Sequence, residues 1–350
     1  MHGTVRAMPR VLAVDAQSPD AGVVAEAARV LRQGGLVAIP TETVYGLGAR
    51  ALDERALARV FAAKGRPTHH PLIAHVLGEA QASELASAWP ASAALLAQAF
   101  WPGPVTLVVE RAGHVPASVA GGGASIAVRA PSHAVARAVI AALGEPVAAP
   151  SANRYQGLSP TRAEHVVKQL GDALDLVLDA GPCEAGIEST VVDVREEPPR
   201  VLRPGAVTLG QLRSVLPRGV LASAERVEAP AARASPGMDA RHYAPRARLV
   251  LAGTWEEAQE VVQRLSSQGA RVGAAVRDGA DAVAAVAPPR PTGAVVVRSM
   301  PRDPAGYARA LYATLHELDD ACVDVIVVQA VPSDEAWWAI ADRLARATQK

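Results

Sequence analysis

The sequence is poor in cysteine, in aromatic residues and in net charge. Its 350 residues include only two cysteines, Cys183 and Cys322, and no Cys-x-x-Cys pair. This disfavours a structural zinc site or a disulfide framework and favours a reducing compartment. Aromatic residues make up 3% of the chain, and 35 basic residues balance 35 acidic ones. A protein that holds nucleic acid mainly by positive charge and base stacking would have an excess of basic residues and more aromatic residues.

Long uncharged hydrophobic runs and the apolar core of a signal peptide are also missing, so we expect no membrane-spanning segment and a cytoplasmic protein. The chain has no P-loop, no Gly-x-Ser-x-Gly elbow and no pair of carboxylates spaced for acid–base catalysis. An enzyme built on this chain is therefore expected to work by positioning and charge neutralisation rather than through a protein nucleophile.

The composition and the length favour two globular domains, because half of the residues are hydrophobic and 20% are charged. Up to about residue 216, apolar runs typical of strands alternate with stretches of helical periodicity, which predicts one α/β domain over 15–216. We predict its helices at 21–33, 53–63, 132–143 and 161–170, and its strands at 36–39, 71–76, 105–110, 125–129, 146–149, 174–179, 190–194 and 200–202.

The remainder of the chain divides into a linker and a second domain. Residues 217–247 are rich in Ala, Pro, Arg and Ser and show no sustained period, which is typical of a linker. Regular alternation of strands and helices over 248–350 predicts a small parallel sheet covered by helices. No Gly-x-Gly-x-x-Gly follows its first strand, so nothing there indicates a dinucleotide site.

Polar side chains gather in the loop after the predicted strand 36–39. Thr41, Glu42, Thr43 and Tyr45 supply two hydroxyls, a carboxylate and a phenol, and two glycines follow. In open α/β sheets ligands bind beyond the carboxyl ends of strands, and glycine lets a backbone approach a ligand closely. The loop is therefore a candidate binding site, although a simple polar turn has the same composition.

Two cations, Lys64 and Arg66, follow the predicted helix 53–63 in a chain that contains only three lysines. Separated by one glycine, they suit a polyphosphate, because arginine offers a planar fork and lysine a point charge. Cations also stabilise the carboxyl end of a helix without binding anything. Three histidines lie within seven positions from His69, but their spacing matches no zinc signature, so no metal site is predicted.

Further polar residues follow other predicted strands. Ser151 and Asn153, the only asparagine of the chain, alternate directly after the strand 146–149, so both side chains can face a phosphate, a ribose or a base edge. Three more side chains stand at strand ends: Arg129, Ser189 and Arg203. Each alone is typical of a surface charge or a turn, and together they predict a cationic cleft.

Motifs in these segments occur in a fixed order along the chain. They are PTETVYGLGA at 40–49, KGRP at 64–67 with PLIAH at 71–75, FWPGPVTLV at 100–108, VRAP at 128–131, PSAN at 150–153 with SPT at 159–161, GIESTVVD at 186–193 and LRPG at 202–205. In this set the chain resembles the YrdC-type threonylcarbamoyl-AMP synthases, and SPGMDARHYAP at 235–245 resembles their two-domain branch. The resemblance implies a twisted mixed α/β sheet with a concave cationic cleft and a smaller Rossmann-like domain.

The resemblance also implies an activity. Enzymes of this family join L-threonine, bicarbonate and ATP into L-threonylcarbamoyl-AMP and release pyrophosphate. Mg²⁺ enters with the ATP, and no metal site of the protein itself is implied. A separate transferase complex then uses the product to modify an adenosine of tRNA, so no stable nucleic-acid complex is expected for this chain. The linker is implied to fold back over the active site.

Residue roles follow from the same resemblance. The set implied for threonine is Thr41, Thr43, His75, Arg129 and Ser189. The set implied for ATP is Lys64, Arg66, His70, Ser125, Ser151, Asn153, Ser159, Arg203 and Tyr243, of which Lys64 and Arg66 are also expected to be catalytic. Tyr243 is expected to act together with His242. The family commonly has asparagine where this chain has His70, so the nucleotide contact at that position is a departure.

Two rival functions share the same domain. One is an RNA-binding module that uses the concave cationic face, which the zero net charge and the few aromatic residues disfavour. The other is a carbamoyl transferase of the hydrogenase-maturation type. That layout requires cysteine-rich zinc modules, and two cysteines exclude it.

Overall fold

The computed structural model describes residues 9–222, 242–277 and 294–349. These residues form two compact units. The second unit consists of Gln156–Ser159, Ala185–Ile187 and the described residues from His242 onward, and the first unit contains the rest. Most of the predicted linker, residues 223–241, lies outside the described residues. No helix in the described ranges combines the length and the apolar character needed to cross a bilayer.

The first unit is built on a mixed sheet with the strand order β1-β8-β2-β3-β7-β4-β6-β5-β9-β10-β11. Its strands are β1 (Arg10–Ala13), β2 (Val37–Ile39), β3 (Gly46–Arg50), β4 (Ile73–His75), β5 (Val105–Glu110), β6 (Ser125–Arg129), β7 (Val147–Ala148), β8 (Leu176–Asp179), β9 (Thr190–Asp193), β10 (Arg200–Arg203) and β11 (Leu221–Ala222). Its helices are α1 (Ala21–Arg32), α2 (Glu54–Lys64), α3 (Glu79–Glu84), α4 (Ala91–Phe100), α5 (Ala134–Leu143), α6 (Ala163–Leu170) and α7 (Leu209–Val215), with a 3-10 turn η1 (Gly171–Ala173).

The sheet contains both parallel and antiparallel strand pairs. The pair β4 and β6 is parallel, whereas β7 runs antiparallel to β4 and β3, and β5 runs antiparallel to β6. Helices α1 and α5 pack together and bury their apolar faces on the sheet around Val37, Ile39, Leu176 and Leu178. Their apolar residues recur at helical spacing, and removal of this surface from water stabilises the layer. The predicted mixed α/β class of the first unit is confirmed.

The strand β3 was not among the predicted strands. Its sequence begins with Gly46, Leu47 and Gly48, and glycine has a low strand propensity, so the loop predicted over 40–48 is too long at its carboxyl end. The structure explains the glycines. A Cβ atom at Gly48 would lie 2.6 Å from Cδ1 of Ile39 and 2.9 Å from the carbonyl oxygen of Val37. Close packing against the neighbouring strand therefore overrides propensity.

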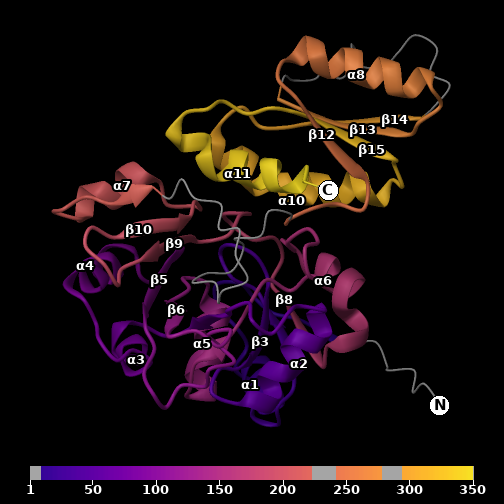
Figure 1. Ribbon diagram of the computed structural model, residues 1–350. Helices are drawn as coiled ribbons and strands as arrows, with labels where there is room; N and C mark the ends of the chain where they lie inside the picture. The colour runs from indigo at the N-terminus through magenta and orange to yellow at the C-terminus, as the bar shows by residue number, and fades with distance from the viewer. Residues whose placement is uncertain (1–8, 223–241, 278–293, 350) are drawn as a thin grey trace. The chain divides into compact units, whose positions relative to one another are not determined.

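The second unit has a parallel sheet with the order β12-β15-β13-β14 (Figure 1). Its elements are β12 (Arg248–Ala252), α8 (Trp255–Ser267), β13 (Val272–Val276), β14 (Val295–Ser299), α10 (Pro304–Asp320), β15 (Val325–Gln329), the 3-10 turn η2 (Glu335–Trp337) and α11 (Trp338–Ala347). Helix α8 covers one face of the sheet and α10 the other (Figure 1). The small parallel sheet predicted for the end of the chain is confirmed.

Candidate functional site

The loop between β2 and β3 holds a chain of hydrogen bonds with a fixed direction. Thr41 Oγ1 donates to the carbonyl oxygen of Val44 at 2.6 Å, which uses its only proton. The 2.9 Å contact between the hydroxyls of Thr41 and Thr43 is therefore donated by Thr43. Both side chains are buried. The hydroxyl of Thr43 can consequently accept a hydrogen bond from a ligand but has no proton left to donate.

Arg129, the last residue of β6, is held on three sides. Its Nη1 donates to Thr43 Oγ1 at 2.9 Å, its Nε donates to the carbonyl oxygen of Gly103 at 3.2 Å, and its Nη2 lies 2.6 Å from Oε1 of Glu42. The Arg129 and Glu42 side chains are only 4% and 6% exposed. A guanidinium fixed in this way is a rigid receptor for an anion, because little of its freedom remains to be lost on binding.

His75 ends the neighbouring strand β4 and pairs in register with Arg129. Burial, reinforced by the positive charge of Arg129, lowers the pKa of His75 from 6.5 to about 3. The imidazole is therefore neutral near pH 7 and offers a donor and an acceptor rather than a charge. Its Nδ1 lies 3.3 Å from the carbonyl oxygen of Ile73.

Lys64 is the last residue of α2, and its side chain points into the protein. The ammonium nitrogen Nζ donates to the carbonyl oxygens of Ser151 and Asn153 at 2.5 and 2.6 Å. Burial, followed by the charge of Arg66, lowers the pKa of Lys64 well below its ordinary value. The segment that it binds is itself tied to the sheet, because Ser151 forms a β-bridge with Gly46. Lys64 is thus brought to Ser151 and Asn153, which lie 87 and 89 residues further along the chain.

Arg66 and His70 lie close to this lysine in the chain and are also buried. Gly65 adopts a left-handed conformation with φ 63°, which ends α2 and turns the chain between the two cations. Arg66 Nη2 donates to the carbonyl oxygen of Pro71 at 3.1 Å. The ring of His70 meets the ring of Tyr155 edge-on, with 5.4 Å between centroids. Tyr155 in turn donates its backbone N–H to the carbonyl oxygen of Lys64.

Ser189 and Arg203 form a third buried group. Arg203 Nη2 donates to the carbonyl oxygen of Ser189 at 3.0 Å and to its hydroxyl at 3.2 Å. The same hydroxyl lies 2.7 Å from Oγ1 of Thr106 on β5. The loop before β5 links this group to Arg129, because Thr190 donates its N–H to the carbonyl oxygen of Pro104, next to Gly103. The strand β6, which ends at Arg129, and the strand β9, which begins directly after Ser189, also both pair with β5.

These groups concentrate positive charge in the interior of the first unit. Lys64, Arg66, Arg129 and Arg203 are all buried, whereas the buried carboxylates of this unit are Glu42 and Glu188. Charged side chains are rarely buried, so this concentration of four basic residues marks the region as a candidate site for an anionic ligand. Across the described residues, no group of three or more His, Cys, Asp or Glu side chains is placed to hold a metal ion.

Three other residues were predicted to bind ATP. Ser125 begins β6, four residues before Arg129, and pairs with Glu110 rather than with any other predicted site residue. Ser159 belongs to the second unit, where its carbonyl oxygen lies 3.2 Å from Nε2 of His316. Tyr243 also belongs to the second unit. The roles of these three residues in nucleotide binding stay predictions.

Tyr243 is held in an unusual conformation inside the second unit. Its φ of 61° is left-handed, although it is not a glycine. Its ring packs against Tyr312 at 6.0 Å between centroids, and the guanidinium carbon of Arg343 lies 4.9 Å from the ring centroid. The side chain is buried. These contacts hold the side chain of Tyr243 inside the second unit.

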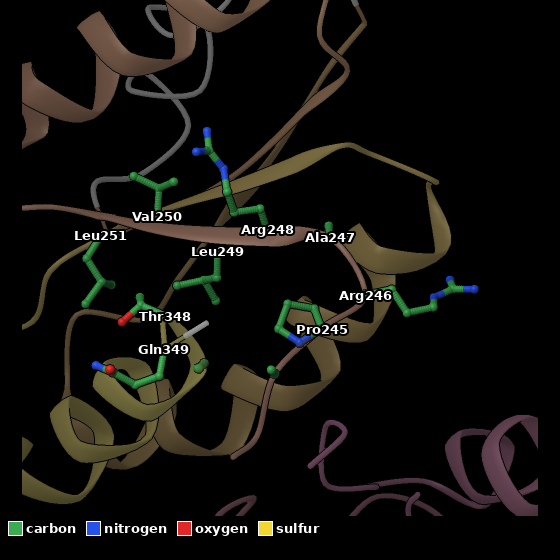
Figure 2. A pocket seen from close by; sticks show the side chains of 11 residues that line it. Pro245, Arg246, Ala247, Arg248, Leu249, Val250, Leu251, Thr348 and Gln349 are labelled. Carbon is green, nitrogen blue, oxygen red and sulfur yellow. The ribbon is translucent and has the colours of Figure 1, made fainter. Parts of the chain in front are cut away.

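A separate cavity of about 630 Å³ lies along the edge strand β12 of the second unit. Figure 2 shows Leu249 and Leu251 pointing to one side of the strand, towards Thr348 and Gln349, while Val250 points to the other. None of the predicted site residues lines this cavity. Its lining combines apolar residues with Arg246, Arg248, Thr348 and Gln349.

Two side chains of the site had no role assigned to them from the sequence. Glu42 was noticed only as part of a polar loop, and its partner Arg129 is distant in the chain. Thr106 interrupts the otherwise apolar strand β5, and a hydroxyl in a buried strand is the signal that would have identified it.

Comparison with known families matches both halves of the chain. A family model described as Telomere recombination matches residues 29–205, and one described as Threonylcarbamoyl-AMP synthase, C-terminal domain, matches residues 207–349. The boundary between the two matches falls close to the end of the first predicted domain.

Relatives cover nearly the whole chain. The threonylcarbamoyl-AMP synthase of Pyrococcus abyssi is 38% identical over 327 residues, which is 92% of this chain and 93% of that protein. The Bacillus subtilis protein of the same name is 36% identical over 333 residues, covering 93% and 92%. A crystal structure of P. abyssi Sua5 complexed with L-threonine superimposes with a TM-score of 0.87 and 35% identity over 97% of both chains. The chain therefore belongs to the threonylcarbamoyl-AMP synthase family and is an enzyme.

Proposed function

We propose that this enzyme converts L-threonine, bicarbonate and ATP into L-threonylcarbamoyl-AMP, pyrophosphate and water. The observation that carries the proposal is the set of buried cations in the first unit, in a chain whose formal net charge is +0. The reaction has to bring a carbamate and a polyphosphate together, and both are anions. Fixed positive groups stabilise two anions that lie close together, and they do so most strongly in a site that excludes water.

The amino acid is proposed to bind at the group formed by Thr41, Thr43, His75, Arg129 and Ser189. Arg129 is oriented to receive the carboxylate, and Thr43 Oγ1 can accept a hydrogen bond from the amine or the hydroxyl of the substrate. His75 is neutral, so it adds hydrogen bonding without repelling the ammonium group. A solved relative is described as complexed with L-threonine, which supports this choice of substrate.

The ATP phosphates are proposed to bind at Lys64 and Arg66. The two carbonyl oxygens that now hold Lys64 lie in the segment proposed for the nucleotide, so phosphate oxygens can replace them as acceptors. Mg²⁺ is proposed to enter on the triphosphate, whose oxygens are the ligands that it prefers. Once the threonine amine has formed the carbamate with bicarbonate, a carbamate oxygen attacks the α-phosphorus and pyrophosphate leaves. Ser125, Ser151, Asn153, Ser159, Arg203, His70 and Tyr243 are proposed to hold the rest of the nucleotide.

The product is a mixed anhydride, which is an activated carbamoyl donor. We propose that a separate transferase complex passes its threonylcarbamoyl group to tRNA. Direct RNA binding is a weaker alternative for the site described above. Its cations are buried, and a phosphodiester backbone is held by cations that reach the surface.

The test is pyrophosphate release by the purified full-length chain with ATP, threonine and bicarbonate each omitted in turn. We expect release only with all three present, and a nucleotide product whose mass contains one threonine and one carbon from ¹³C-bicarbonate. Serine in place of threonine controls for a general amino-acid requirement. Release that needs neither threonine nor bicarbonate would refute the proposed function.

A further inference from the structure

We infer that Glu42 is a positioning residue that orients the guanidinium of Arg129 towards the substrate carboxylate. The inference rests on the proposed function, because it concerns how the same site recognises threonine. The sequence indicated the polar loop that contains Glu42 but no role for this residue itself.

The first observation is the ion pair itself. Oε1 of Glu42 lies 2.6 Å from Nη2 of Arg129, and both side chains are almost completely buried. A buried guanidinium without a counter-charge is strongly destabilising, and so is a buried carboxylate. Each group therefore requires the other in this place.

The second observation is the way in which the contacts are shared. Glu42 and its neighbour Thr43 bind the two terminal nitrogens of Arg129, and Gly103 binds Nε. Two hydrogen bonds and one ion pair fix the plane of the guanidinium, and its five N–H groups leave donors for a ligand. Two of the three contacts come from one short loop, which makes the orientation of Arg129 depend on that loop.

The surroundings of Glu42 disfavour a role as a proton acceptor. Although burial alone would raise the pKa of its carboxyl group, the charge and hydrogen bonding of Arg129 bring that pKa below the ordinary value of 4.5. The group is therefore ionised near pH 7 and is a poor proton acceptor for the threonine ammonium. Its Oε1 lies 2.6 Å from Nη2 of Arg129, so the carboxylate faces the guanidinium. What remains is an action through Arg129.

The variant that tests this is Glu42→Gln, which keeps the size of the side chain and removes its charge. We expect the KM for threonine in pyrophosphate release to rise about tenfold or more, since one partner of a buried charge pair is removed. The KM for ATP should change less than twofold. Glu42→Asp keeps the charge with a shorter reach, and we expect it to recover part of the loss. A role in stability alone would not separate the two substrates in this way.

Two controls make the result decisive. Glu145→Gln breaks the half-buried ion pair with Arg50, 2.6 Å long and remote from the site, and should leave both KM values unchanged. Threonine binding without ATP, followed by calorimetry, measures the same effect independently of turnover. Wild-type enzyme without activity would refute the proposed function, whereas active wild type with an unchanged threonine KM in Glu42→Gln would refute this inference. If Glu42→Gln lacks a cooperative thermal transition, the Asp variant decides, and an unchanged threonine KM there overturns the inference.

Discussion

His75 and Arg129 stand opposite each other at the carboxyl ends of two parallel strands, and only the arginine is charged. The histidine is neutral because burial and the neighbouring guanidinium lower its pKa, and that guanidinium is itself paired with the Glu42 carboxylate. The two neighbouring side chains therefore differ in what they offer a ligand. Arg129 offers a positive charge that suits a carboxylate, and His75 offers neutral hydrogen-bonding groups.

This relationship predicts a pH-dependent stability. The pKa of His75 is about 3 in the folded protein and 6.5 in an unfolded chain. Below pH 6.5 the unfolded chain therefore takes up a proton that the folded protein does not, so stability is full above that pH and falls as the pH drops towards 3. Because of His75, we expect the free energy of unfolding to fall by about 2 kcal/mol between pH 7 and pH 5.

The substitution His75→Gln should remove that part of the slope. Urea unfolding of both proteins between pH 5 and pH 7 measures the difference in a range where Glu42 stays ionised. Parallel curves for the two proteins would show that the imidazole is not kept neutral by folding. His133, whose pKa is also lowered by burial, is present in both proteins and cancels in the comparison.

Replacement of Lys64 by methionine should abolish most of the activity. The substitution keeps the length of the side chain and removes the ammonium group that is proposed to bind the phosphates. We expect kcat/KM for ATP to fall by about 10²–10³, the usual cost of one lost electrostatic contact to a transition state. Lys168→Met, on the exposed face of α6, is the matched control and should have wild-type activity. A Lys64→Met enzyme within threefold of wild type would contradict the assignment.

The two threonines of the β2–β3 loop should differ in importance. Thr43→Val removes the acceptor for Arg129 and for the substrate, so we expect the KM for threonine to rise by about 10- to 100-fold, equivalent to about 1–3 kcal/mol. Thr41→Val removes the partner of the Thr43 hydroxyl and the bond to the Val44 carbonyl oxygen, but it leaves the acceptor for Arg129 in place, so we expect a smaller effect. Measured KM values in the reverse order would show that Thr41, and not Thr43, contacts the substrate.

Much of the fold and of the candidate site could be predicted from the sequence, because it depends on local sequence patterns. The strands at Val105–Glu110 and Ser125–Arg129 were predicted to the residue, since each contains a short apolar run with β-branched residues. Because ligands bind beyond the carboxyl ends of strands, these strands also predicted Arg129 and the residues after β7 as site residues. The regular alternation of the second unit likewise predicted its parallel sheet.

The parts that the sequence did not predict depend on tertiary contacts. The partner of Arg129 is a carboxylate from a distant loop, and no local pattern relates Glu42 to β6. The strand β3 was not predicted because it contains glycines, which have a low strand propensity. Glycine is required at Gly48 because Ile39 and Val37 leave no room for a Cβ atom. Ser159 follows a first-unit strand in the chain but belongs to the second unit, which only the contacts reveal.

A last prediction concerns Gly205, which follows Arg203 in the LRPG motif. A Cβ atom at this position would lie 2.3 Å from the backbone carbon of Ser189 and 2.3 Å from the nitrogen of Thr190. Backbone atoms in a strand cannot move aside as a flexible side chain does, so Gly205→Ala must displace Ser189. We expect a loss of about 1–3 kcal/mol in the free energy of unfolding, the usual cost of overpacking.

The same displacement should raise the KM for threonine, because Ser189 is proposed to lie at that substrate. Gly113→Ala is the matched control, since no atom lies within 4 Å of the position of its Cβ. Chemical denaturation and pyrophosphate release measured on both variants separate the two effects. If Gly205→Ala lowers stability but leaves the threonine KM at the wild-type value, Ser189 has no part in threonine binding, whereas a rise in KM seen only with Gly205→Ala places the β9 strand end at the substrate.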